Sequence, residues 1–170
     1  MDAFLAPLLR AKTWSTPKIA LRPGADGLGV FACEAISAGE ILLALAHVFV
    51  DRPARHTIQL EARKHQAGTG EIDDFLNHSC DPNSALDFER LELVAIKPIA
   101  PGEELTFNYL TSEWDMAAPF ACMCGAAGCH GLIRGFRHLN LAQQEALVPW
   151  TSSYLRRRLA ELRALRAAVG

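Results

Sequence analysis

The sequence lacks three features that would each assign it to a broad class of protein. No stretch approaches the roughly 20 apolar residues that a membrane-spanning helix requires. Neither sign of charge dominates, because the formal net charge is only -2, so a broad nucleic-acid-binding surface is not expected. The first ten residues hold an acid, Asp2, and only a short apolar run, which does not match a secretory signal. We therefore expect a protein of the reducing cytosol, or of the nucleus if its source has one.

Cysteine is present but unevenly placed. The chain has five cysteines, and Cys122, Cys124 and Cys129 fall within eight positions. In a reducing compartment this pattern favours a metal site over disulfides. A structural zinc site normally closes with four ligands, so a fourth must come from elsewhere. His130 is the local candidate, although adjacent residues rarely both reach one tetrahedral ion.

Half of the 170 residues are hydrophobic, which is enough to bury one core in a single compact unit. Short apolar runs separated by turn residues predict strands rather than long helices in the first two thirds of the chain. The expected strands cover residues 18–21, 30–32, 41–50 and 57–60. A strand pair covers 86–96, with Leu91, Leu93 and Ala95 alternating against Glu92, Val94 and Ile96. Towards the end, Asn140 is a suitable N-cap for a helix over 141–147. Leucines at 3- and 4-residue steps predict a second helix over 152–168, with a solvated basic face.

Two polar stretches about twenty residues apart have the composition of a reaction chamber. Residues 77–83 place two amides, an imidazole, a thiol and a proline in seven positions, which suits neither a helix nor a strand interior. Residues 101–109 begin with a Pro-Gly turn and continue as a strand. Alternation along that strand would place Leu105, Phe107 and Tyr109 on one face.

A glycine-bearing turn lies near the start of the chain. Gly27 and Gly29 follow a break in the strand pattern, and the lack of a side chain there lets backbone amides approach a ligand closely. An ordinary hairpin turn accounts for the same residues, because glycine pairs are common. On these residues alone both interpretations stay open.

Together, four motifs resemble the SET-domain family of S-adenosylmethionine-dependent lysine methyltransferases. In chain order they are residues 26–32, 77–83, 102–109 and the cysteine segment 122–129. The resemblance implies a mainly β fold with some α structure: the SET-domain β-clip of several small sheets around a pseudoknot, with a helical C-terminal tail. The implied divisions are an N-terminal lead-in over 1–17, a SET domain over 18–110, a post-SET zinc segment over 111–135 and the tail over 136–170.

The resemblance also implies roles for particular residues. Tyr109 matches the family's active-site tyrosine, whose hydroxyl would orient the amine and lie against the transferring methyl group. Phe107 matches a substrate-channel position, where phenylalanine implies capacity for more than one methyl group. Contacts to S-adenosylmethionine are implied for Gly27, Leu28, Gly29, Asn77, His78 and Phe120. Phe120 would cover the adenine or simply pack the cysteine segment, and both remain open.

For the metal, the resemblance implies Zn²⁺ bound by Cys80 together with Cys122, Cys124 and Cys129. Such a site would fasten the C-terminal segment to the polar stretch around Cys80 and couple metal binding to formation of the cofactor pocket.

Two positions depart from the family's pattern. Asp74 precedes Phe75 where the family often has arginine, which puts one cofactor contact in doubt. Asn108 replaces a common aspartate, and we expect it to face away from Phe107 and Tyr109 with little effect on chemistry.

The function implied is methyl transfer from S-adenosylmethionine to a lysine side-chain amine of a protein. One alternative is the same fold acting on free lysine, a peptide or another small-molecule amine, because the insert over 51–70 is short. The other is a catalytically inactive, zinc-stapled binding module. A protein-lysine enzyme should ignore the free amino acid, and the small-amine enzyme should prefer it.

Overall fold

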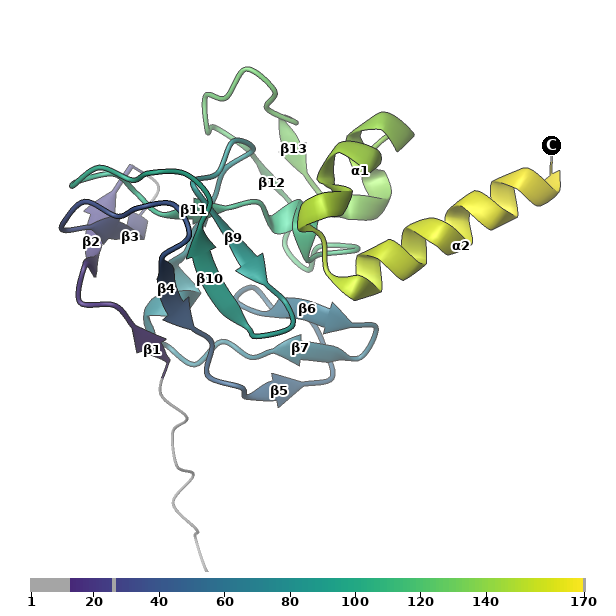
Figure 1. Ribbon diagram of the computed structural model, residues 1–170. Helices are drawn as coiled ribbons and strands as arrows, with labels where there is room; N and C mark the ends of the chain where they lie inside the picture. Colours follow the sequence, from purple (N-terminus) through teal and green to yellow (C-terminus); the bar gives the residue numbers. More distant parts are fainter. Residues whose placement is uncertain (1–12, 26, 170) are drawn as a thin grey trace, which may run out of the picture.

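The computed structural model describes residues 13–25 and 27–169 (Figure 1). Residues 1–12 of the lead-in predicted over 1–17 lie outside the described residues. Asp26 of the glycine motif lies outside them as well. The rest forms five small sheets and few helices, so the mainly β prediction with a helical C-terminal tail is confirmed. The strands are β1 (Trp14–Ser15), β2 (Ile19–Gly24), β3 (Gly27–Ala32), β4 (Ile41–Ala44), β5 (Phe49–Val50), β6 (Ile58–Glu61), β7 (Lys64–Gln66), β8 (Asn77–His78), β9 (Ser84–Asp87), β10 (Glu92–Ala95), β11 (Thr106–Phe107), β12 (Phe120–Ala121) and β13 (Leu132–Ile133).

The largest sheet has four antiparallel strands in the order β1-β4-β10-β9. Leu43 pairs with Leu93, and both side chains are fully buried. Along β10 the side chains alternate between half-buried and buried, so the predicted alternation is confirmed. The sheet therefore turns one face to the main core. Its members are all buried: Ile19, Val30, Ala32, Ile36, Leu42, Leu43, Leu45, Ile58, Leu76, Leu86, Leu91, Leu93, Ala95, Ile99, Leu105 and Phe107.

The single strand predicted over residues 41–50 is wrong. The chain forms β4, leaves the sheet, and forms β5 at the edge of a second sheet of order β5-β7-β6. The break includes His47, whose φ of 53° lies in the left-handed region that few non-glycine residues adopt. A continuous apolar run concealed this break, because both halves have strand composition.

The two polar stretches identified in the sequence lie side by side. β8 and β11 pair in parallel, with Thr106 opposite Asn77 and Phe107 opposite His78. The intervening hairpin of β9 and β10 makes this a long-range pairing. The buried Asn83 takes the place of a further strand: its Nδ2 donates to the Glu104 carbonyl (2.8 Å) and its Oδ1 accepts from the Thr106 amide (3.0 Å).

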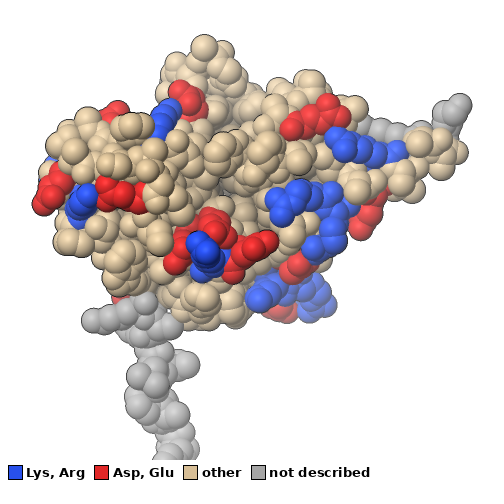
Figure 2. Space-filling model, viewed as in Figure 1, with Lys and Arg blue, Asp and Glu red and all other residues tan. Residues whose placement is uncertain are grey.

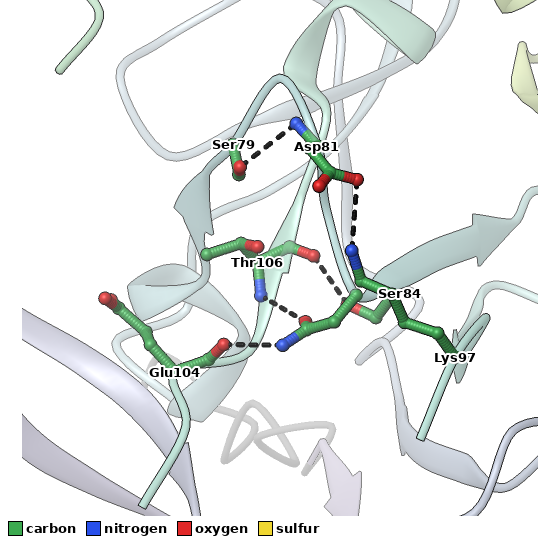
Figure 3. Close-up of polar contacts among 7 residues, drawn as sticks. Ser79, Asp81, Ser84, Lys97, Glu104 and Thr106 are labelled. Carbon is green, nitrogen blue, oxygen red and sulfur yellow. Dashed lines mark hydrogen bonds and ion pairs between the residues drawn. The ribbon is translucent and has the colours of Figure 1, made fainter. Parts of the chain in front are cut away.

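Figure 3 shows these contacts together with a second link, from the Ser84 hydroxyl to the Thr106 carbonyl at 2.8 Å. It also shows the outer turn of the same loop, where the Asp81 amide donates to Ser79 Oγ and Lys97 pairs with the Asp81 carboxylate. After β8, the loop over 79–83 is thus fixed largely by side-chain hydrogen bonds rather than by a ladder.

Two α-helices follow the cysteine segment, as predicted. Helix α1 (Leu141–Leu147) begins with a capping box, in which Asn140 accepts from the Gln143 amide while the Gln143 side chain accepts from the Asn140 amide. Helix α2 (Ser153–Val169) extends away from the body of the molecule (Figure 1), and blue side chains gather over it in the space-filling view (Figure 2). Within the described residues, no helix combines the length and hydrophobicity needed to cross a membrane.

Candidate active site

A cleft of about 540 Å³ opens where β8, β11 and the short 3-10 helix η2 (Tyr109–Thr111) meet the insert. Its lining includes residues 54–58, 66–67 and 73–74, together with residues 76–78, 107 and 109. Residues 112–113 and 116–124 complete the lining. Of the residues predicted to bind cofactor or substrate, the cleft brings together Asn77, His78, Phe107, Tyr109 and Phe120.

Tyr109 is held at both its backbone and its hydroxyl. Its amide donates to Nδ1 of His78 at 3.1 Å, and its Oη donates to the Leu76 carbonyl at 2.6 Å. Burial is the main reason that the pKa of Tyr109 rises to about 12, with the Glu104 carboxylate adding to the effect. The phenol is therefore neutral at physiological pH. It can orient a group through its oxygen but cannot act as a strong base there.

Aromatic rings surround the Tyr109 phenol. Its ring lies 4.8 Å from that of Phe107 and 6.0 Å from that of Phe120, centroid to centroid. His78 stands edge-on to Phe120 at 5.7 Å. Phe120 also packs on the small cluster of Leu110, Cys122 and Ile133, as one of its two interpretations expects. It lines the cleft as well, and the covering of an adenine stays a prediction.

The glycine motif lies beside the cleft rather than in its wall. The Asn77 side-chain amide donates to the Leu28 carbonyl at 3.2 Å and to Glu104 Oε1 at 2.6 Å, which ties the β2–β3 hairpin to β8. A Cβ on Gly29 would come within 2.2 Å of that same Glu104 oxygen. Glycine is thus required at 29 by the packing of Glu104, and both Asn77 donors are already used inside the protein. Gly27 and Leu28 are exposed on the same hairpin.

The four thiols of Cys80, Cys122, Cys124 and Cys129, called the cysteine cluster below, come together as predicted. Their sulfur atoms all lie within 4.8 Å of one another. The sulfur of Cys80 lies 3.9 Å from that of Cys122 and 4.0 Å from that of Cys129. Zinc–sulfur bonds of about 2.3 Å in a tetrahedron place the sulfurs roughly 3.8 Å apart, so the donor set and its spacing fit a metal ion such as Zn²⁺.

His130 does not complete this cluster. Its backbone amide points to the Cys80 sulfur at 3.5 Å, while its ring Nδ1 meets the Gln143 side chain at 3.2 Å. His78 instead connects the cluster to the cleft, since its Nε2 lies 3.3 Å from the Cys80 sulfur and its Nδ1 accepts from the Tyr109 amide. Burial lowers the pKa of His78 to about 4, with His130 contributing, which keeps the ring neutral.

Sequence reasoning missed three residues of this region. Asn108 is buried and caps η2, because its Oδ1 accepts from the Leu110 amide at 3.0 Å. Glu113 and Gln66 line the cleft and are buried as well. Burial raises the pKa of Glu113 to about 7, against hydrogen bonds from the Gln59 amide and Ser112 that lower it. The only signal for Glu113 in the sequence is an acid four residues after Tyr109, in the stretch assigned to the post-SET segment.

Comparisons with known proteins agree with this geometry. Residues 27–110 match the model of the SET domain. The chain is 44% identical over 68 residues to Methyltransferase flvH of Aspergillus flavus, which covers 39% of this chain and 38% of that protein. It is 42% identical over 72 residues to Histone-lysine N-methyltransferase Set2 of Drosophila melanogaster, which covers 39% of this chain but 3% of that protein.

Among solved structures, KRYPTONITE in complex with mCHG DNA and SAH superposes with a TM-score of 0.53 at 25% identity. That match covers 67% of this chain and 28% of the KRYPTONITE chain. The chain thus spans little more than a third of flvH and a small part of Set2.

Proposed function

From the premise that this chain belongs to the SET-domain family of methyltransferases, we propose that it transfers methyl groups from S-adenosylmethionine to a lysine side-chain amine of a protein. The observation that carries the proposal is the parallel pairing of β8 with β11, which places His78, Phe107 and Tyr109 on one cleft. The names of relatives such as Set2 support lysine as the acceptor.

The residues of the cleft suit an amine that must be held and stripped of water. The Tyr109 hydroxyl, fixed to the Leu76 carbonyl, offers its oxygen to the acceptor nitrogen. Phe107 is buried against the Tyr109 ring and carries no hydroxyl that would retain a water molecule beside the amine. We infer that more than one methyl group can be accommodated on the same nitrogen. Fixed orientation of the reacting groups supplies much of the rate in such transfers.

The cleft also fits the methyl donor. Its volume lies within the range of about 300–1,000 Å³ that encloses cofactors and drug-sized ligands. Phe120 and His78 provide ring surfaces for an adenine, and Asn77 keeps its side-chain oxygen as an acceptor after both its donors are used. When bound, S-adenosylmethionine supplies the electrophilic methyl group on a sulfonium. The hairpin of Gly27 to Gly29 supports this wall through Asn77.

For the metal, we infer that the cysteine cluster holds a structural Zn²⁺. Four thiolates leave no open position for substrate, which is the pattern of structural rather than catalytic zinc. The ion would lie at the junction of β8, β12 and β13, and its binding would position Phe120 over the cleft.

The test is mass spectrometry of acceptors after incubation with labelled S-adenosylmethionine. Two pools are offered to the full chain: proteins from a cell extract, and small amines that include free lysine. Label in lysine side chains of protein, lost with Tyr109→Phe, is the expected result. Label confined to small amines would replace the proposal with small-molecule methylation. If S-adenosylmethionine binds but neither pool is labelled, the result would favour the catalytically inactive binding module.

A further inference from the structure

Glu113 is the cleft residue for which the proposed function has no role. It lies four residues after Tyr109, and its backbone amide donates to the Tyr109 carbonyl at 3.0 Å, so its position is fixed relative to the phenol. Only 7% of the residue is exposed, yet it contributes to the wall of the cleft. An ionisable group placed this deep costs stability unless it is paired or used.

The two carboxylate oxygens of Glu113 differ. Oε1 accepts from the Gln59 amide at 2.8 Å and from the Ser112 hydroxyl at 3.1 Å. Among the described residues, the structure records no donor on Oε2. Gln66 lines the same cleft at 1% exposure, and its side-chain oxygen has no hydrogen-bond partner in the described structure. Glu113 and Gln66 thus each keep a side-chain acceptor without a donor in the lining of one cleft. A group that brings only donors is complementary to them, and an ammonium is such a group.

The cleft has other ionisable groups, and most of them already have a hydrogen-bond partner. They are Arg55, His56, Asp73, Asp74, His78 and Tyr109, besides two thiols of the cysteine cluster. Arg55 has no hydrogen bond or ion pair among the described residues, and its charge acts on Tyr109.

Asp73 accepts from the Thr13 hydroxyl, and Asp74 accepts from the Gly70 amide. The ring of His56 meets the Asp74 carbonyl at 3.1 Å. From α2, Arg158 stacks over the Trp114 ring and pairs with Glu161. Glu113 is therefore the buried carboxylate of this cleft that adjoins Tyr109 in the chain and keeps one oxygen without a donor.

We propose that Glu113 binds the acceptor's ammonium through Oε2 and takes its proton before methyl transfer. The inference rests on the proposed function. An N–H bond of the ammonium breaks and an O–H bond forms on Glu113, which leaves a neutral amine and a carboxylic acid. The nitrogen lone pair then forms the N–C bond as the C–S bond of the donor breaks, with its electron pair going to sulfur. Glu113 returns its proton to water after the product leaves.

This role predicts a particular pH dependence. A lysine amine has a reference pKa of about 10.4, so the acceptor arrives as an ammonium at neutral pH. Burial raises the pKa of Glu113 to about 7, so the free enzyme holds the required carboxylate above that value. The apparent kcat/KM should rise to a plateau near pH 7. Without Glu113, the rate should follow the neutral fraction of the amine and keep rising towards pH 10.

Glu113→Gln isolates the role. The glutamine keeps an oxygen for the Gln59 amide and the Ser112 hydroxyl and changes only the atom at Oε2. Asp115→Asn is the matched control, because it removes a carboxylate two residues along the chain and outside the cleft lining, and keeps oxygen and amide atoms at the same position. We expect Glu113→Gln to lower kcat/KM by about 100-fold at pH 8, with a much smaller deficit near pH 10. Asp115→Asn should keep the plateau. Equal profiles for Glu113→Gln and the unmodified chain, or loss of the plateau in Asp115→Asn, overturns the inference.

A binding measurement separates this inference from the proposed function. n-Butylammonium is titrated calorimetrically into the full chain with S-adenosylhomocysteine present. We expect Glu113→Gln to weaken binding by about 10-fold or more and Asp115→Asn, outside the cleft lining, to leave it unchanged. That result supports the inference even if no acceptor is methylated, in which case only the proposed function fails. The ammonium site is rejected, whatever the methylation assay shows, if the unmodified chain does not bind n-butylammonium. It is also rejected if the unmodified chain binds it no more tightly than Glu113→Gln does.

Discussion

The two ends of the molecule are stabilised by different physical means. The sheet of β1, β4, β10 and β9 closes over a continuous apolar core whose members are all buried. The segment of β12 and β13 buries Cys122 and Ile133 against Leu110 of η2, and relies on the cysteine cluster. A chain short of apolar contacts at one end can compensate with a metal, because binding free energy then becomes folding free energy.

The cleft lies at the boundary of these two ends, and this explains how its residues are held. On one side, the Tyr109 hydroxyl is fixed by the carbonyl of Leu76, and the Leu76 side chain belongs to the main core. On the other side it is linked through His78 to the Cys80 sulfur. The difference suggests that the two ends can be perturbed separately, and that the site should respond to both.

The largest effect is expected from removal of the metal. With the proposed Zn²⁺ bound, a chelator should release the β12–β13 segment, because structural zinc contributes on the order of 10 kcal/mol in small domains. Hydrogen exchange measures this directly. The Cys122 amide, bonded to the Gly131 carbonyl, should lose protection, while the Ala95 amide, bonded to the Glu40 carbonyl, should keep it.

Two cysteine variants provide the control for this prediction. Cys129→Ser should lower metal content and reproduce the loss of protection. Cys33→Ser should do neither, because Cys33 lies outside the cluster, half-buried beside Arg22. If the Ala95 amide loses protection together with the Cys122 amide, the two ends do not unfold separately, and the comparison breaks.

Next in size is a cavity in the main core. Leu93 is fully buried between β4 and β9, so Leu93→Ala should cost about 2–5 kcal/mol of unfolding free energy. Leu132 on β13 is 53% exposed, so Leu132→Ala should lower the free energy of unfolding only a few tenths as much. Urea unfolding gives the free energies, and metal analysis should find the zinc content of both variants unchanged. A loss of metal in Leu93→Ala would show that the core supports the cysteine cluster.

The sequence predicted the parts of this molecule that depend on local pattern or on residue chemistry. The alternation in β10 and the Asn140 cap follow from side-chain period and capping preference, and both are confirmed. Cys80 could be placed with the distant cysteines only through the family resemblance, and the structure brings its sulfur to theirs. The break at His47 and the burial of Glu113 depend on tertiary packing, which the pattern of residues along the sequence does not reveal.

A smaller effect is expected from the buried charge of Glu113. Its folded-state pKa of about 7 exceeds the ordinary value of 4.5 because of burial, so the folded state favours the protonated form. This contribution to stability is fully present below about pH 4.5 and is lost as pH rises through 7. Relative to Glu113→Gln, the unmodified chain should therefore lose roughly 3 kcal/mol between pH 4.5 and pH 8. Urea unfolding at the two pH values checks this. A difference independent of pH would mean that the carboxyl is not desolvated at the boundary of the two ends.

The smallest effect on stability, and the one that separates stability from catalysis, is expected at Asn108. Its side chain caps η2, so Asn108→Ala should cost about 1 kcal/mol. Because Tyr109 is the first residue of that helix, the same change should lower methyl transfer more than tenfold while the Ala95 amide stays protected. Asn108→Asp keeps an oxygen for the Leu110 amide and should preserve most of the activity, which makes it the matched control. Unchanged kcat in Asn108→Ala would mean that Leu76 and His78 alone position the phenol. The site would then depend on the two ends of the molecule and not on the turn between them.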